Sequence, residues 1–199
     1  MKEKKNIRII PKIDIKNNSL IKGVNLEGLR ILGDPYDYAI SYYEEGADEL
    51  MFNDAVASLY GTNTLSKIIN KLAKNVFIPI SVGGGLRNLE ISKQLFNSGA
   101  DKIFVNSQVL RDGKYLKNLI KFFGSANITV SIEAIKYQNK YYTSALGGRE
   151  IFQIDPFYWA SKCEDLGCGE IMVTSVDKEG LMQGSDLLLF EKILNKIKI

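Results

Sequence analysis

The chain has 199 residues, of which 45% are hydrophobic and 25% are charged, so residues 1–199 are long and apolar enough for a single domain with a substantial core. The net charge of +3 is too small to indicate nucleic-acid binding. The sequence contains no run of roughly 20 apolar residues, so nothing in it suggests membrane insertion. Histidine is absent, which excludes Ser-His-Asp triads and His-based zinc sites, and the two cysteines form no disulfide framework, so we expect a reduced cytoplasmic setting with neither a metal site nor a cofactor.

Short apolar runs alternate with helical patterns along the chain, which indicates repeated strand–helix units and a parallel sheet. The apolar runs predict strands over residues 7–14, 49–54, 77–82, 102–106, 127–133 and 170–175. The helical patterns predict helices over residues 35–45, 62–74, 88–98, 112–123, 156–166 and 186–196. The long segments 15–33 and 134–154, which follow the first and fifth strands, are predicted to be loops.

Long loops after strands and short loops before them are typical of a TIM (β/α)8 barrel. Six of the eight strand–helix units of such a barrel are present. A complete barrel needs about 250 residues, and an open parallel sheet would leave strand edges unpaired. We therefore expect an α/β protein that forms a single, partial βα-barrel domain, and we expect the chain to be truncated.

The chain contains two related halves. An apolar strand that ends in Asp14 is matched by a later strand that ends in Glu133, and Asp34-Pro35 and Asp155-Pro156 each open a helix. In both helix starts the Asp caps free backbone N–H groups and the Pro suits the first helical position. Each half therefore delivers one carboxylate at the carboxyl end of a strand.

Asp14 and Glu133 are the candidate acid–base pair. They end the first and fifth strands, which face each other across a closed barrel, and strand alternation directs both toward the lumen if their faces point inward. Opposed carboxylates can divide acid and base roles and contribute roughly 10²–10⁴-fold in rate. The structural alternative is two acids that only accept hydrogen bonds from loop N–H groups, and the symmetry of the pair favours chemistry.

A glycine run follows the third strand and precedes a helix, which favours a phosphate site, because successive glycines allow backbone N–H groups to approach an anion closely. The run consists of Gly83, Gly84 and Gly85. Asn106 and Ser107 follow the neighbouring strand, and Gly180, after the sixth strand, could contribute to a second anion site. The alternative is that these glycines only form tight turns.

Four charged residues are expected in one layer at the opposite end of the barrel. Glu49, Lys102 and Glu170 each open a strand after a glycine-containing turn, and Arg8 completes two positive and two negative charges. On physical grounds alone this layer is a neutral ionic plug that satisfies buried charge, because the bottom face of a barrel usually serves stability.

As an ordered set, these motifs resemble the cyclase subunit of imidazole glycerol phosphate synthase, from histidine biosynthesis. The matching segments run along nearly all of the chain and include Arg8-Ile9-Ile10-Pro11, Lys22-Gly23-Val24-Asn25, Gly33-Asp34-Pro35, Val82-Gly83-Gly84-Gly85, Gly99-Ala100-Asp101-Lys102 and Thr174-Ser175-Val176-Asp177. The resemblance implies a duplicated (β/α)8 barrel. It also implies a lyase that receives ammonia from a glutaminase docked at the barrel's bottom and closes an imidazole ring on a phosphorylated ribonucleotide.

The resemblance also implies roles for individual residues. Asp14 and Glu133 would be the acid–base residues, and Lys22 would touch substrate. Phosphate binding falls to Gly83, Gly84, Gly85, Asn106, Ser107, Asp177 and Gly180, with Gly180 in a second phosphate site. The ionic gate at the ammonia entrance falls to Arg8, Glu49, Lys102 and Glu170.

Four residues depart from the family pattern. Glu133 stands where the family usually has Asp, Lys12 points into the lumen where a small residue is usual, Asn53 replaces an apolar residue and Phe104 is bulkier than expected. Such departures resemble paralogues from surface-polysaccharide gene clusters, which are thought to aid glutamine-dependent amidation of a sugar. That reading, and an inactive truncated fragment, are the alternatives to a histidine-pathway cyclase.

Overall fold

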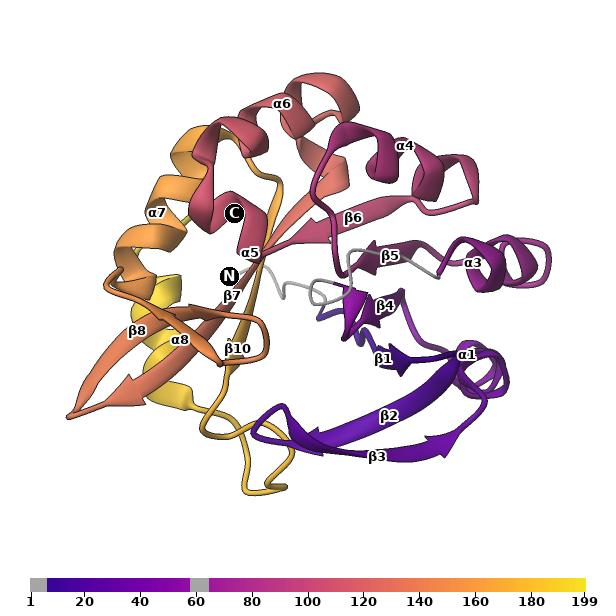
Figure 1. Ribbon diagram of the computed structural model, residues 1–199, viewed down its shortest axis with the longest axis horizontal. Helices are drawn as coiled ribbons and strands as arrows, with labels where there is room; N and C mark the ends of the chain where they lie inside the picture. The colour runs from indigo at the N-terminus through magenta and orange to yellow at the C-terminus, as the bar shows by residue number, and fades with distance from the viewer. Residues whose placement is uncertain (1–6, 58–64) are drawn as a thin grey trace, which may run out of the picture.

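The computed structural model describes residues 7–57 and 65–199, which contain a curved sheet with helices along its outer side (Figure 1). The parallel strands follow one another across the sheet in chain order: β1 (Lys12–Lys16), β4 (Leu50–Asp54), β5 (Ile80–Gly83), β6 (Lys102–Val105), β7 (Ile128–Tyr137) and β10 (Glu170–Ser175). Sequential parallel strands with a helix in each crossover are the repeating unit of a TIM barrel. The expected α/β class and parallel sheet are therefore confirmed.

The helices lie close to their predicted positions. They are α1 (Pro35–Glu44), α3 (Ser66–Leu72), α4 (Leu89–Asn97), α5 (Ser107–Arg111), α6 (Gly113–Phe123), α7 (Pro156–Leu166) and α8 (Leu187–Leu194). Asp34 and Asp155 cap their helices as expected, since Oδ1 of Asp34 accepts from the N–H of Tyr36 at 2.7 Å and Oδ1 of Asp155 accepts from the N–H of Phe157 at 2.7 Å. The start of the helix predicted over 62–74 lies outside the described residues, and α5 was not predicted. Among the described helices, none is long and apolar enough to cross a membrane.

The prediction that 15–33 and 134–154 are loops is wrong. The first segment contains β2 (Ser19–Val24) and β3 (Glu27–Gly33), and the second contains β8 (Lys140–Ala145) and β9 (Glu150–Phe152), all paired antiparallel. The tight turns between β1 and β2 and between β7 and β8 place Asn17, Asn18, Gln138 and Asn139 at positive φ, which asparagine tolerates better than most residues. Most residues of β3 are solvent-exposed, so this strand lacks the apolar alternation that marks a strand in a sequence.

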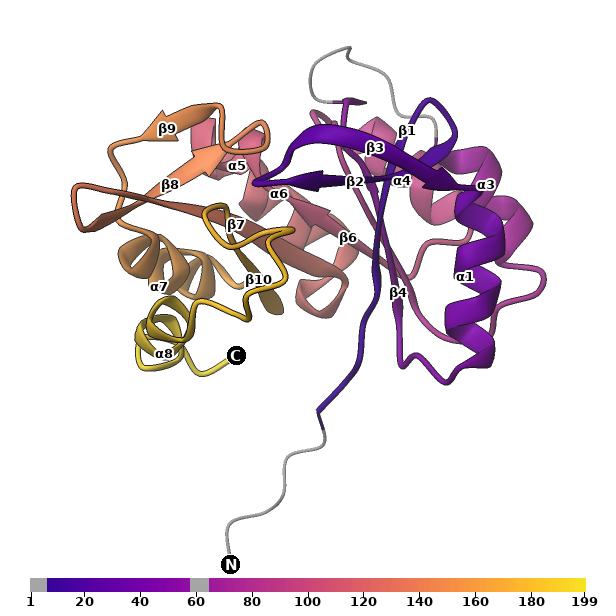
Figure 2. The same ribbon diagram turned by 90° about the horizontal axis from the view of Figure 1, so that it is seen from below.

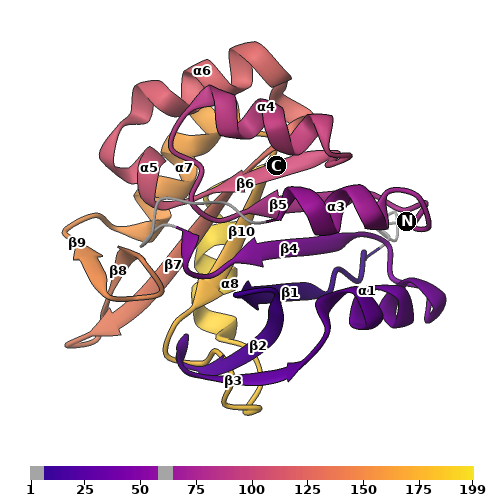
Figure 3. The ribbon, with the colours of Figure 1, turned by 45° about the vertical axis from the view of Figure 1, so that its right-hand side comes forward.

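The hydrophobic core lies between the sheet and the helices, not inside the curve of the sheet. Alternate residues such as Phe52, Val82, Ile103 and Val130 are fully buried against the helix layer. Figure 3 shows α3, α4 and α6 along this outer face. Strand alternation turns the residues between them inward. Most of these inward-facing residues are polar or charged. The concave face is therefore a polar lumen.

Within the described residues, β10 and β1 border the parallel sheet and are not hydrogen-bonded to each other. At the carboxyl ends of the strands, the tip of the β2–β3 hairpin lies beside the loop that follows β10 (Figure 1). The backbone N–H of Asn25 donates to the carbonyl of Glu179 at 2.8 Å, and its Nδ2 donates to the carbonyl of Val176 at 2.8 Å. Figure 2 shows both hairpins at this end of the sheet. The hairpin and this loop therefore connect the two borders of the sheet.

Gly83 and Phe104 provide a test of packing inside the lumen. They are cross-strand neighbours, and a Cβ added at Gly83 would overlap the Phe104 ring. We expect Gly83→Ala to lower the free energy of unfolding by about 1–3 kcal/mol, the usual cost of overpacking. In a Phe104→Leu background the same substitution should cost less, as measured by urea unfolding of all four proteins. An equal cost in both backgrounds would show that the ring is not the cause.

Candidate functional site

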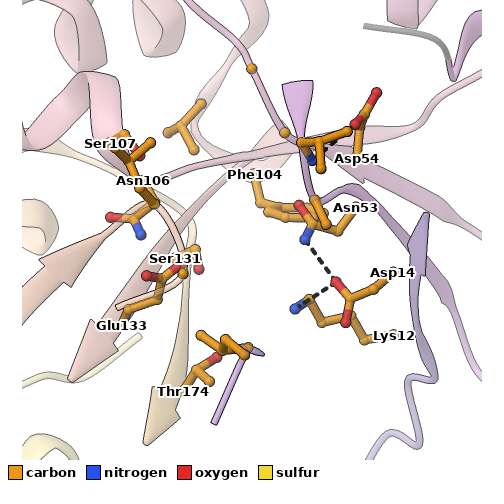
Figure 4. A pocket seen from close by; sticks show the side chains of 18 of the residues that line it. Lys12, Asp14, Asn53, Asp54, Phe104, Asn106, Ser107, Ser131, Glu133 and Thr174 are labelled. Atoms are coloured by element: carbon orange, nitrogen blue, oxygen red, sulfur yellow. Dashed lines mark hydrogen bonds and ion pairs between the residues drawn. The ribbon is translucent and has the colours of Figure 1, made fainter. Parts of the chain in front are cut away.

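A cavity of about 310 Å³ lies at the carboxyl ends of the parallel strands, on the lumen side (Figure 4). It brings together most of the residues that the sequence analysis singled out for chemistry. Those that line it are Asp14, Lys22, Gly84, Gly85, Asn106, Ser107 and Glu133. Lys12, Asn53 and Phe104, the departures from the family pattern, line the same cavity. This is the end of the sheet at which barrel enzymes carry their active sites.

Asp14 lies on β1, and two donors meet one oxygen of its carboxylate. Nδ2 of Asn53 donates to Oδ1 of Asp14 at 2.7 Å, and Nζ of Lys12 forms an ion pair with the same oxygen at 3.0 Å. Asn53 is opposite Asp14 in the β1–β4 register, and Lys12 precedes Asp14 by two residues and so shares its face of the strand. Asp14 is therefore held in a fixed position by its own strand and its neighbour.

Glu133 lies on β7, and Figure 4 shows its side chain on the opposite side of the cavity from Asp14. Its Oε2 accepts a hydrogen bond from the backbone N–H of Gly148 at 3.0 Å. Burial raises the pKa of Glu133, although the N–H of Gly148, the charge of Lys12 and Asn106 act in the opposite direction. Glu133 therefore does accept a hydrogen bond from a loop N–H, as the purely structural explanation of this acid requires. This hydrogen bond does not cancel the rise in pKa that burial causes. Glu133 keeps its proton to a higher pH than an ordinary glutamate.

The glycines beside the cavity are explained partly by packing. Gly84 and Gly85 have φ values of +97° and +67°, a region that favours glycine. A Cβ at Gly84 would overlap the backbone of Asp54, and one at Gly85 would lie 2.6 Å from the Cβ of Ala57. These glycines therefore allow the loop after β5 to approach the end of β4. Both readings of the run, close packing and anion binding, are compatible with this position.

Asn106 and Ser107 lie where β6 passes into α5. Nδ2 of Asn106 donates to the carbonyl of Ser144 at 3.3 Å, and its Oδ1 is buried without a hydrogen-bond partner among the described residues. Ser107 is the first residue of the short helix α5. The amide of Asn106 thus contacts the β8 backbone, and it also lies beside the Glu133 carboxyl (Figure 4).

Other predicted binding residues are placed differently. Gly83 is covered by Phe104 and does not line the cavity. Asp177 does not line it either, since its Oδ2 accepts from the backbone N–H of Lys136 at 2.7 Å. Gly180, at φ +76°, packs against the carbonyl of Gly23, so it serves the contact with the β2–β3 hairpin.

Lys22 lines the cavity but its ammonium is paired with Glu179, which lines it as well. The sequence analysis did not single out Glu179. Its position immediately before Gly180, in the loop that follows a barrel strand, was the available signal. The ion pair links the β2–β3 hairpin to that loop above the cavity.

Four charged residues meet at the amino-terminal ends of the strands, as the sequence analysis predicted. Glu49 pairs with Arg8 at 3.0 Å and with Lys102 at 3.1 Å, and Glu170 pairs with Lys102 at 3.1 Å and also with Arg8. The side chain of Glu49 is only 1% exposed, whereas that of Arg8 is 48% exposed. Burial alone would raise the pKa of Glu170, but hydrogen bonds from Arg8 and Lys102 outweigh it and lower that pKa. We call these four residues the ionic cluster.

Neither cysteine is a candidate nucleophile. Cys163 and Cys168 are both buried, and burial raises the pKa of the Cys168 thiol to about 12 and that of the Cys163 thiol further. A thiol with such a pKa is unreactive at neutral pH. Within residues 7–57 and 65–199 there is also no group of three or more Cys, Asp or Glu side chains that could hold a metal ion. The ionisable groups that line the cavity are carboxylates, lysine ammonium groups and the guanidinium groups of Arg87, Arg111 and Arg149.

Comparison with known proteins extends the resemblance along nearly the whole chain. A family profile described as "Histidine biosynthesis protein" matches residues 8–199. The chain is 44% identical over 195 residues to imidazole glycerol phosphate synthase subunit HisF of Legionella pneumophila, an alignment that covers 98% of this chain and 92% of that protein. It is 39% identical over 194 residues to the HisF subunit of Petrotoga mobilis, covering 96% of this chain and 77% of that protein. It is 42% identical over 192 residues to the HisF subunit of Campylobacter concisus, covering 96% and 76% respectively.

Removal of Glu49 tests how strongly the ionic cluster stabilises the fold. We expect Glu49→Ala to lower the free energy of unfolding by about 3 kcal/mol, because it removes the buried partner of two cations. Arg8→Ala is the matched comparison, and it should cost at most about 1 kcal/mol because Arg8 is half-exposed. Chemical denaturation of both variants at low and high salt measures the difference. Equal losses would contradict the claim that burial of Glu49 anchors the cluster.

The raised pKa of Glu133 predicts how the free energy of unfolding changes with pH. Because its pKa is raised in the folded protein, its favourable contribution is complete below the pKa of an unfolded glutamate and is lost as pH rises through the folded pKa. Glu133→Gln removes this loss. The stability of the Gln variant relative to the wild type should therefore increase between acidic and neutral pH, as measured by urea unfolding across that range. A difference that does not change with pH would contradict the raised pKa.

Proposed function

The chain belongs to the histidine biosynthesis family and is a cyclase subunit of the imidazole glycerol phosphate synthase type, and we propose that its reaction takes place between Asp14 and Glu133. A cyclase of this type uses ammonia to close an imidazole ring on a phosphorylated ribonucleotide. The observation that carries the proposal is that two carboxyl groups from different strands line one cavity at the carboxyl ends of the sheet. Their surroundings differ in the way that a division of acid and base roles requires.

The two acids have separate roles in proton transfer. Addition of ammonia to a carbonyl, followed by loss of water, requires that the nitrogen lose protons and that the departing oxygen gain them. Asp14, ion-paired with Lys12, is the base that removes a proton from nitrogen. Glu133, whose pKa is raised by burial, is the acid that delivers a proton to oxygen.

Phosphate binding is assigned to the side of the cavity formed by Gly84, Gly85, Asn106 and Ser107. Backbone N–H groups at glycines and the amide and hydroxyl groups of Asn106 and Ser107 are suitable donors for a phosphate. Lys22 contacts the substrate from the β2–β3 hairpin after its ion pair with Glu179 breaks. The proposal does not extend to Asp177, because its carboxylate is engaged by Lys136 outside the cavity.

The relatives are named as subunits, which implies a partner subunit for this chain. We infer that the partner is a glutaminase and that it docks around the ionic cluster. The cluster lies at the opposite end of the lumen from the cavity, and Arg8 is half-exposed there. Ammonia released by the partner would then enter through the cluster and travel along the lumen. We also propose that residues 1–199 form a single, partial βα-barrel domain and that the protein acts in the cytoplasm.

A second candidate function is support of glutamine-dependent amidation of a sugar in surface polysaccharide synthesis. The ion pair of Lys12 with Asp14 favours it, because a charged lumen suggests an acceptor different from the usual one. An assay with the histidine-pathway nucleotide and an ammonium salt distinguishes the two. Turnover supports the cyclase, whereas no product together with binding of a nucleotide sugar supports the sugar acceptor.

Asp14→Asn tests the proposed base. We expect ammonium-dependent turnover of the histidine-pathway nucleotide to fall by roughly 10²–10⁴-fold, the usual contribution of one acid–base group. Asp37→Asn, an exposed change of the same kind in the first turn of α1, is the control and should leave turnover unchanged. Full activity in the Asp14→Asn protein would rule out its role as the base.

A further inference from the structure

Lys12 is a charged residue in the cavity to which the division of acid and base roles assigns no step of its own. Its side chain is 27% exposed, lines the cavity and points toward Asp14 (Figure 4). An ammonium group is strongly hydrated, and its removal from water is unfavourable unless it is paired. Here the partner is the carboxylate of Asp14, which forms an ion pair with Lys12 and is also the proposed base. The lysine and the reaction therefore share one carboxylate.

The geometry leaves part of each group available to a bound molecule. Lys12 and Asn53 both contact Oδ1 of Asp14, and among the described residues no hydrogen bond reaches Oδ2. Asp14 is also the sole described ion-pair partner of the Lys12 ammonium, which has three N–H donors. The cavity therefore presents a free acceptor oxygen beside free N–H donors of a fixed cation.

A donor beside an acceptor matches a particular substrate group. A carbonyl under attack by ammonia has an oxygen that gains negative charge and a nitrogen that must lose a proton. An N–H donor aimed at the oxygen and a carboxylate oxygen aimed at the nitrogen fit these two needs. We propose that Lys12 is a further substrate-contacting residue of this site, which donates a hydrogen bond to the carbonyl oxygen of an open-chain keto or aldehyde sugar phosphate.

The step balances in atoms and charges. The nitrogen lone pair forms the C–N bond and the carbonyl π pair moves to oxygen, where Lys12 stabilises the negative charge. Oδ2 of Asp14 accepts a proton from nitrogen, and Glu133 delivers a proton to oxygen. The immediate product is a neutral carbinolamine. This inference rests on the proposed function, because the sequence of proton transfers is the one assigned there.

Lys12→Met tests the inference, since it keeps the length of the side chain and removes the charge. We expect kcat in the full chain to fall by roughly 10²–10³-fold, as when one donor to a developing oxyanion is removed, with a much smaller change in KM. Lys12→Arg keeps the charge and should retain part of the activity. Lys117→Met, an exposed change of the same kind on α6, is the control. Wild-type kcat in Lys12→Met would overturn the inference.

A binding measurement separates this inference from the proposed function. Ribulose 5-phosphate and ribitol 5-phosphate differ only in a carbonyl against a hydroxyl, so their affinities report recognition of the carbonyl without turnover. Calorimetry should show that the wild type prefers the ketone and that Lys12→Met loses the preference. Preference without any turnover would leave the inference standing and would refute the proposed reaction between Asp14 and Glu133. Turnover in a wild type that binds both probes equally would overturn the inference alone.

Discussion

The pairing of charges inside the curved sheet is the constraint on which the site depends. Alternate residues of each parallel strand face the lumen, and a charge there is unfavourable unless an opposite charge or a hydrogen bond meets it. The ionic cluster satisfies this requirement at one end with two cations and two anions. Near the other end, Lys12 pairs with Asp14. Glu133 has no ion-pair partner in the described part of the chain. The two acids therefore differ in that Asp14 is paired with a cation and Glu133 is not.

The same constraint connects fold and function. β1 supplies both Lys12 and Asp14, so the base and its cation are positioned by one strand, and β4 adds Asn53 to the same carboxylate oxygen. β7 places Glu133 across the cavity, where burial dominates its protonation. The β2–β3 hairpin covers this region and is tied to the loop after β10 through Asn25 and Lys22. Proton donor, proton acceptor and cover therefore come from different elements that meet at the carboxyl ends of the strands.

Much of this arrangement follows from strand alternation and helix starts alone. The helix over 156–166 and the strand over 170–175 have the predicted bounds, because their caps and apolar runs are local signals. Three members of the ionic cluster were predictable because Glu49, Lys102 and Glu170 each lie at or directly before a strand start. Arg8 precedes β1 by four residues and was placed with them because it completes the charge balance. The hairpins were missed because the exposed β3 lacks apolar alternation. The other hairpin strands are defined by tight turns and by antiparallel pairing with their neighbours, which the apolar pattern does not report. Glu179 and the outward position of Asp177 depend on loop geometry, which the sequence pattern does not encode.

The unequal surroundings of the two acids are the central claim, and ¹³C NMR titration of the Glu133 carboxyl tests it most directly. Comparison of the wild type with Glu133→Gln assigns the resonance. The account predicts that Glu133 releases its proton at a pH clearly above the ordinary glutamate value of about 4.3. A midpoint at or below that value would mean that burial does not govern this carboxyl, and the assignment of Glu133 as the acid would be wrong.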